Sequence, residues 1–344
     1  MRCRLLTITL ADFYVGVVSL TLPAVAVLCP TADDRPAHLE PLQGRVDLRF
    51  TDAAGLGAAL DGARGLFLWD FFSQAVEDVW DRAGDLEWIH VAAAGVDKLL
   101  FPRLRESDVV VTNARGVFDR PIAEFVLASV LAHAKLLYES EALRRTRTWD
   151  ERAPLRIEGA RALVIGTGGI GRATGRLLSA VGMKVSGAGR RARTDDPDLG
   201  EVYESAGLAS YVGDFDYVVN AAPLTPATRG LIDATVLKAM KPSAYLVNVG
   251  RGQSVVEDDL ISALRDGTIA GAALDVFETE PLPESSPLWT MPQVAVSAHM
   301  SGNVVGWTDD LAHQFVDQAQ RWLDGRPLDN VVDKQLGFVS GASS

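Results

Sequence analysis

Three glycines in the middle of the chain have the spacing of a loop that binds a dinucleotide. Gly166, Gly168 and Gly171 follow the apolar run 162–165 and precede residues 172–181, which favour a helix. In such a strand–turn–helix unit the first glycine makes a tight turn, the second admits a pyrophosphate and the third allows close helix packing. The phosphates would lie at the N-terminus of the helix, where backbone N–H groups attract anions. The alternative is a tight strand–helix turn without a ligand.

The end of the next predicted strand, 184–188, indicates which dinucleotide would bind. It is followed by Gly-Arg-Arg-Ala-Arg, and no acidic residue occurs before Asp195. NAD-binding sites place a carboxylate there on the ribose 2′-hydroxyl, whereas guanidinium groups bind a 2′-phosphate. We therefore predict NADP(H) in preference to NAD(H), with Arg190 and Arg191 as the contacts. The alternative is a solvated basic loop.

Composition narrows the class of protein. The 344 residues suggest about two domains, and with 23% charged residues the chain is typical of a globular protein. The formal net charge of −12 argues against nucleic acid as a partner, because neutralising phosphates requires a basic face. The two cysteines, Cys3 and Cys29, form no C-x-x-C pair. We therefore expect no disulfide framework and no metal, and a reducing cytoplasm fits best.

The N-terminus contains an apolar run, residues 5–22, that resembles a signal peptide with a cleavage site after Ala26. However, Asp12 interrupts the run, and cleavage there would cut the first predicted core strand, 24–29. We therefore favour an extension that precedes the first strand. The run is too short and too interrupted to span a membrane.

Apolar strands alternate with helical segments along most of the chain, which predicts an α/β fold with parallel sheets and helical crossovers. One long helix is expected over 121–146, and its wide apolar surface suggests an interdomain or subunit contact. An amphipathic helix is expected over 307–323. Strands are expected at 24–29, 46–51, 65–69, 86–92 and 108–112, and, after the glycine loop, at 184–188, 217–222, 244–249, 271–276 and 294–298.

Several motifs in order resemble the D-isomer-specific 2-hydroxyacid dehydrogenase family, from about residue 24 to 332. Behind the glycine loop come Pro-Leu-Thr-Pro-Ala-Thr (223–228), Asn-Val-Gly-Arg-Gly (248–252), Leu-Asp-Val-Phe-Glu-Thr-Glu-Pro-Leu-Pro (274–283) and Ser-Ala-His (297–299). Residues 88–97 and 113–118 look most like the glyoxylate/hydroxypyruvate reductase branch.

The resemblance implies two doubly wound, Rossmann-like parallel-sheet domains with an interdomain cleft. The substrate (lid) domain would be flavodoxin-like, with residues 1–117 completed by the C-terminal region 306–344. Residues 118–305 would form the dinucleotide-binding domain. The protein would be a homodimer.

The resemblance also implies three catalytic residues. Arg251 would hold the carboxylate and carbonyl of a 2-keto acid, since its planar guanidinium suits a bidentate grip. His299 would give a proton to the carbonyl oxygen during reduction, because histidine can exchange protons near neutral pH. Glu280 would bond the other ring nitrogen and fix the tautomer of His299.

Further contacts follow from the same resemblance. Backbone N–H groups of Ala94, Gly95 and Val96 would bind the substrate carboxylate. Trp69 would line the pocket or belong to the core, and Asp275 would orient the nicotinamide carboxamide. The remaining cofactor contacts are expected at Gly169, Ile170, Ala222, Pro223, Val249 and Gly250.

The sequence therefore predicts an NADPH-preferring reductase that converts glyoxylate, hydroxypyruvate or a related small 2-keto acid to the D-2-hydroxy acid. One alternative is a dehydrogenase for a bulkier, aromatic or branched 2-keto acid. Another is a non-enzymatic NAD(P)-sensing interaction protein, as in the related transcriptional co-repressors. The absence of basic or low-complexity segments disfavours that last alternative.

Overall fold

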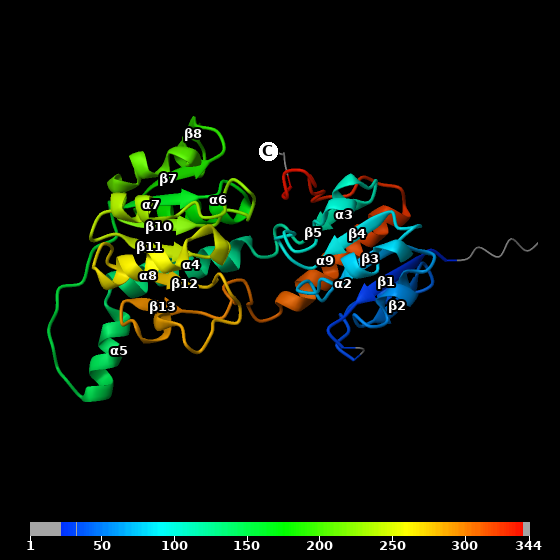
Figure 1. Cartoon of the computed structure of the whole chain (residues 1–344), viewed down its shortest axis with the longest axis horizontal. Helices are drawn as coiled ribbons and strands as arrows, with labels where there is room; N and C mark the ends of the chain where they lie inside the picture. Colours follow the sequence, from blue (N-terminus) through cyan, green and yellow to red (C-terminus); the bar gives the residue numbers. More distant parts are fainter. Residues whose placement is uncertain (1–21, 32, 340–344) are drawn as a thin grey trace, which may run out of the picture.

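The computed structural model describes residues 22–31 and 33–339, which form two lobes (Figure 1). Each lobe is built on its own mainly parallel sheet with helices on its faces. This arrangement confirms the predicted α/β class with two doubly wound sheets. The predicted N-terminal extension lies almost entirely outside the described residues.

The first sheet has the strand order β2-β1-β3-β4-β5, and all its neighbouring strands are parallel. All five residues of its inner strand β1, which lies between β2 and β3, are buried. A strand covered on both faces requires such a continuous apolar run. The strands are β1 Ala24–Leu28, β2 Asp47–Thr51, β3 Ala63–Leu68, β4 Trp88–Val91 and β5 Val110–Asn113, and the helices are α1 Leu56–Leu60, α2 Ala75–Asp78 and α3 Pro102–Glu106, with 3-10 turns at Glu40–Leu42 and Trp80–Arg82.

The second sheet has the order β13-β12-β11-β10-β6-β7-β9-β8, and only β8 runs antiparallel to its neighbour. We did not predict β8 and β9, because both are short and rich in polar residues. Buried Asp196, at the end of β8, binds Arg172 and Arg193 at 3.0 and 2.8 Å. The strands are β6 Arg161–Ile165, β7 Lys184–Gly189, β8 Arg193–Asp196, β9 Gly200–Glu204, β10 Tyr217–Asn220, β11 Tyr245–Asn248, β12 Gly271–Leu274 and β13 Val294–Val296.

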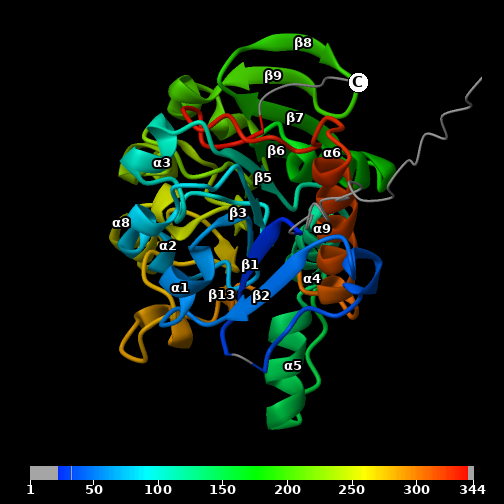
Figure 2. The same cartoon turned by 90° about the vertical axis from the view of Figure 1, so that its right-hand side faces the viewer.

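The helices of the second lobe cover both faces of its sheet (Figures 1 and 2). Helix α4 packs against α6 and, through a His133–Tyr245 ring stack at 4.1 Å, against β11. The helices of this lobe are α4 Asp119–Ala134, α5 Leu137–Thr146, α6 Gly169–Ala180, α7 Ala234–Ala239 and α8 Glu257–Arg265, with 3-10 turns at Ser205–Ser210, Val212–Asp214, Gly252–Ser254 and Pro287–Thr290.

The prediction of one continuous helix over 121–146 was wrong. The chain forms α4 and α5, which meet at an angle of 57°. Leu136 adopts a left-handed conformation with φ of 55°, and this conformation ends the helical hydrogen bonding. No glycine or proline marks the break. Helix α5 has no buried residue and projects from the lobe (Figure 1).

The last helix, α9 Trp307–Leu323, returns from the second lobe to the first sheet (Figure 1). The Phe315 ring stacks on Phe67 of β3, with centroids 3.8 Å apart. Trp322 packs against Trp88 of β4 at 5.6 Å. These aromatic contacts bury one side of the amphipathic helix against the lobe that the chain left at β5. Two connections, β5 to α4 and β13 to α9, therefore join the lobes.

Among residues 22–31 and 33–339, no single helix is both long and apolar enough to cross a membrane. Helices α4 and α5 reach the required length and apolar composition only when the two are counted together as one bent segment. Seven of the sixteen residues of α4 are buried inside the protein. Within the same residues, no group of three or more His, Cys, Asp or Glu side chains could hold a metal ion.

Candidate active site

A cleft of about 1100 Å³ lies between the two lobes, and both contribute to its walls. The first lobe supplies segments that follow β3, β4 and β5. The second supplies segments that follow β6, β7, β10, β11, β12 and β13. These are all carboxyl ends of parallel strands, where open α/β sheets bind their ligands. The predicted interdomain cleft therefore exists in the structure.

The glycine loop forms one wall of this cleft. Gly166 adopts φ of 103°, and a Cβ there would lie 2.7 Å from the carbonyl oxygen of Ala221. Only glycine is compatible with both the conformation and the contact. Helix α6 begins at Gly169, so its first N–H groups are directed toward the cleft. The loop thus has the geometry that an anionic pyrophosphate requires.

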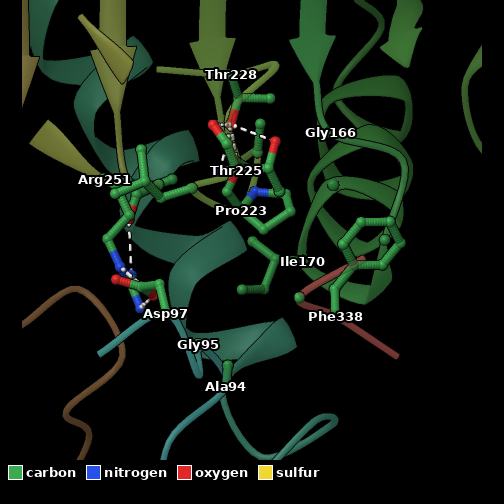
Figure 3. Close-up of a pocket in the computed structure, with 18 of the residues that line it drawn as sticks. Ala94, Gly95, Asp97, Gly166, Ile170, Pro223, Thr225, Thr228, Arg251 and Phe338 are labelled. Carbon is green, nitrogen blue, oxygen red and sulfur yellow. Dashed lines mark hydrogen bonds and ion pairs between the residues drawn. The ribbon is translucent and has the colours of Figure 1, made fainter. Parts of the chain in front are cut away.

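Arg251 links the two lobes across the cleft (Figure 3). Its Nε donates to Oδ1 of Asp97 at 3.1 Å, and its Nη2 lies 3.0 Å from the same oxygen. Its Nη1 donates to the carbonyl of Gly250 at 2.9 Å. Asp97 follows β4 in the first lobe, whereas Arg251 follows β11 in the second. The guanidinium is therefore held in one orientation by groups from both lobes.

Buried polar side chains beneath Arg251 hold its backbone. Asn220 donates to Asn248 Oδ1 at 2.8 Å and to Ser254 Oγ at 2.6 Å. Ser254 Oγ donates to the carbonyl of Arg251 at 2.5 Å, and Asn248 Nδ2 donates to it at 3.3 Å. A satisfied buried network of this kind rigidifies its surroundings. It explains structurally why an asparagine stands three residues before Arg251.

His299 and Glu280 form a hydrogen-bonded pair at the other side of the cleft. His299 Nδ1 lies 2.8 Å from Glu280 Oε2, and Glu280 Oε1 accepts from the N–H of Phe277 at 3.0 Å. Burial raises the pKa of Glu280, but these two hydrogen bonds and nearby Lys98 outweigh it and hold that pKa below its usual value. The carboxylate is therefore ionised and available to orient the imidazole.

The backbone of His299 adopts a left-handed conformation with φ of 51°. Asp275 supports this turn from below. Its carbonyl accepts from the N–H of His299 at 2.8 Å, and its fully buried carboxylate accepts from the N–H groups of Met300 and Ser301 at 2.9 and 3.0 Å. A left-handed conformation costs free energy in a residue other than glycine, so it persists only where surrounding interactions hold it. At His299 the hydrogen bonds of Asp275 do so.

Most predicted site residues meet in the cleft, but three do not line it. Trp69 packs against Phe67 at 5.6 Å, beside the core. Arg191 is exposed to solvent, and Asp275 lies beneath the His299 turn. The predicted residues that line the cleft are Ala94, Gly95, Val96, Gly166, Gly168, Gly169, Ile170, Gly171, Arg190, Ala222, Pro223, Val249, Gly250, Arg251, Glu280 and His299.

The structure adds cleft residues that we did not predict. Phe72 is 49% exposed, and its ring stands edge-on to His299 with centroids 5.8 Å apart. Lys98 lies 4.7 Å over the Phe72 ring, and Phe338 approaches from the C-terminal segment. Asp97 ends the motif 88–97 and could have been singled out there. The two phenylalanines carry no local signal, because only folding brings their segments to the cleft.

Comparisons with known proteins agree with this geometry. The family model described as D-isomer specific 2-hydroxyacid dehydrogenase, NAD binding domain, matches residues 127–301. A glyoxylate reductase of Thermofilum pendens is 33% identical over 266 residues, which cover 75% of this chain and 78% of that protein. The resemblance inferred from motifs therefore extends over most of both chains.

Solved structures give the same result. The NADPH-dependent glyoxylate/hydroxypyruvate reductase of Sinorhizobium meliloti, in complex with NADP and sulfate, is 30% identical. Its TM-score is 0.79, with 92% of this chain and 100% of that one covered. A D-isomer specific 2-hydroxyacid dehydrogenase of Xanthobacter autotrophicus, in complex with NADPH and MES, is 31% identical with a TM-score of 0.78, covering 92% and 100%. This chain thus belongs to the D-isomer specific 2-hydroxyacid dehydrogenase family and is an oxidoreductase of that family.

Proposed function

We propose that this enzyme uses NADPH to reduce a small 2-keto acid of the glyoxylate/hydroxypyruvate type to the D-2-hydroxy acid. The observation that carries the proposal is the meeting of Arg251 and the His299–Glu280 pair in the cleft that the glycine loop lines. An anion anchor, a proton donor and a dinucleotide loop are the three parts that this reaction needs. The glyoxylate reductase from Thermofilum pendens and the NADP complex from Sinorhizobium meliloti support the same assignment.

The residues present fit a nicotinamide dinucleotide. A Cβ at Gly250 would lie 2.8 Å from the carbonyl oxygen of Ala222, so the loops after β10 and β11 approach each other closely beside the glycine loop. Gly166 to Gly171 would hold the pyrophosphate, and Arg190 would bind the 2′-phosphate. When bound, the nicotinamide supplies the hydride for C2 of the substrate. Asp275 would act indirectly, by supporting the turn that carries His299 and Ser301.

Arg251 would orient the substrate through its carboxylate and carbonyl oxygens. Because Asp97 and Gly250 already fix the guanidinium, little entropy is lost when the substrate binds. The N–H groups of residues 94–96 would bind the other face of the carboxylate. The carbonyl carbon would then be presented in one orientation, so that one configuration is formed, which is D in the family that the chain belongs to.

His299 would supply the proton. Since Nδ1 is bonded to Glu280, proton transfer falls to Nε2. The carbonyl oxygen of the substrate would take its proton from Nε2 as negative charge develops on that oxygen. The ionised Glu280 stabilises the imidazolium before transfer. Solvent reprotonates His299 for the next turnover.

The projecting helix α5 and the residues behind it suggest an oligomer contact. Leu137 and Tyr138 of α5 are 53% and 48% exposed, and Trp149 behind them is 92% exposed. We propose that a second copy of the chain covers this projecting arm in a homodimer. Sedimentation or light scattering of the wild type and of Trp149→Ser should distinguish a dimer from a monomer.

The test of activity mixes purified protein with NADPH or NADH and with glyoxylate, hydroxypyruvate or phenylpyruvate, while nicotinamide absorbance is followed. Turnover of the first two with NADPH is expected. Efficient turnover of phenylpyruvate alone would favour the bulkier substrate class, for which the exposed Phe72 ring offers a packing surface. No turnover with any of the three would refute the proposal, and a preference for NADH would refute the role of Arg190.

A further inference from the structure

The C-terminal segment 330–339, here called the C-terminal hook, folds back from the first lobe. It begins as a short extension of that lobe's sheet, where Val332 N donates to Val111 O at 2.8 Å. It then turns tightly: Gly337 N donates to Asp333 O at 2.8 Å, and Asp333 N donates to Phe338 O at 3.1 Å. The turn needs a left-handed residue, and Gly337 has φ of 80°.

Side chains anchor the hook to the first lobe. Lys334 Nζ donates to the carbonyl of Val109 at 2.9 Å and also to that of Ser107. Arg105 of α3 donates to the carbonyl of Lys334. The carboxylate of Asp333 accepts from the N–H groups of Gln335 and Leu336. The conformation of the hook is thus set by many bonds rather than by one contact.

The tip of the hook reaches the opposite lobe. Figures 1 and 2 show the red C-terminal segment leaving the first lobe beside α3 and approaching the strands of the second sheet. Phe338 lines the cleft together with Gly337 and Val339. Its ring lies under the guanidinium of Arg190, with 4.8 Å from Cζ to the ring centroid. In Figure 3 the Phe338 side chain lies beside the glycine loop, near Gly166 and Ile170.

We propose that the C-terminal hook is part of the cofactor site and that Phe338 is a positioning residue for Arg190, holding it for the 2′-phosphate of NADPH. This inference rests on the proposed function. A guanidinium stacked on a ring uses only its π face, so its in-plane N–H groups stay free to bind a phosphate. A long arginine side chain held in this way loses less conformational entropy on binding.

The hook also joins cofactor binding to the relative position of the lobes. Arg190 directly follows β7 in the second lobe, whereas the hook is bonded to α3 and β5 in the first. The Phe338–Arg190 contact therefore exists only while the lobes are close together. Binding of a 2′-phosphate by the positioned Arg190 would favour that arrangement.

The test uses fragments that contain only the adenosine end of the cofactor. Calorimetric titration measures the affinity of the full-length enzyme for 2′,5′-ADP, which has the 2′-phosphate, and for 5′-AMP, which lacks it. Phe338→Leu keeps an apolar side chain but removes the ring, and Phe338→Tyr keeps the ring. Gln335→Ala is the matched control, because Gln335 is in the same hook but does not line the cleft.

Phe338→Leu should weaken 2′,5′-ADP binding about three- to tenfold, the range expected when one long side chain must become ordered on binding, and leave 5′-AMP binding unchanged. Phe338→Tyr and Gln335→Ala should bind both fragments like the wild type. In an Arg190→Ala background, Phe338→Leu should have no further effect, because the two residues act as one unit.

Three results would overturn the inference while leaving the proposed function intact. These are unchanged binding of 2′,5′-ADP by Phe338→Leu, equal weakening of both fragments, and tighter binding by the variant. Equal weakening would mean that the ring packs on adenine instead. If the wild type bound neither NADPH nor 2′,5′-ADP, the proposed cofactor would be wrong, and the inference would fall with it.

Discussion

Replacing Gly95 by alanine tests the position of Arg251 without touching Arg251 itself. A Cβ at Gly95 would lie 2.8 Å from Arg251 Cζ, still closer to Nη2, and 3.0 Å from Asp97 Oδ1. The ordinary distance for such contacts is about 3.5–4 Å, so the guanidinium must move by about 1 Å or more. The Arg251–Asp97 bonds across the cleft cannot both survive this movement.

We expect the Gly95→Ala substitution to lower the catalytic rate rather than the stability of the fold. Gly95 does not require a left-handed conformation, and the atoms that must move belong to the end of a flexible side chain. A displacement of about 1 Å in a substrate-positioning group can cost about 100-fold in rate, equivalent to about 2.7 kcal/mol of transition-state stabilisation. We therefore expect kcat/KM to fall about 100-fold for Gly95→Ala, with the melting temperature and NADPH affinity nearly unchanged.

Gly84→Ala is the matched control for this experiment. A Cβ there would meet nothing within 4 Å, so the activity should stay at the wild-type level. Steady-state kinetics with the preferred keto acid, fluorescence titration with NADPH and thermal unfolding cover all three expectations. If Gly95→Ala kept kcat/KM within about threefold of the wild type, Arg251 would not be the substrate anchor in the position described here.

Three further predictions concern other parts of the molecule. His299→Ala should lower turnover severely while NADPH binds nearly as before; near-normal activity would contradict the proton-transfer role. Asp275→Asn should destabilise the fold by about 2 kcal/mol, because its NH₂ would replace one of the two acceptor oxygens and face the N–H donor of Met300 or Ser301; a melting temperature like that of the wild type would contradict this. Burial lowers the pKa of His90 to about 3, so the unfolded chain takes up a proton below about pH 6.5 that the folded protein rejects. Stability should therefore decrease as the pH falls from 6.5 toward 3, by at most about 1.4 kcal/mol per pH unit, and His90→Asn should lose this part of the slope in denaturant titrations.

The spacing of apolar residues along the chain was enough to predict most of the strands and helices. The apolar runs that became β1, β6 and β10 were assigned correctly, since a strand buried on both faces must be apolar throughout. The break between α4 and α5 was not, because Leu136 carries no signal for a left-handed conformation. Strands β8 and β9 were missed because they are short, polar and only partly buried.

The candidate site also has a part that the sequence predicts and a part that only the folded structure shows. Motifs in the sequence by themselves determined the family and singled out the glycine loop, Arg251, Glu280 and His299 as candidate site residues, since residue types at fixed offsets from a strand end are local features. Asp97 against Arg251, the support of the His299 turn by Asp275, and Phe338 against Arg190 join residues separated by 24 to 154 positions. Only the tertiary structure decided these contacts, because they depend on how two lobes and a returning C-terminal segment are placed in space, which no local pattern records.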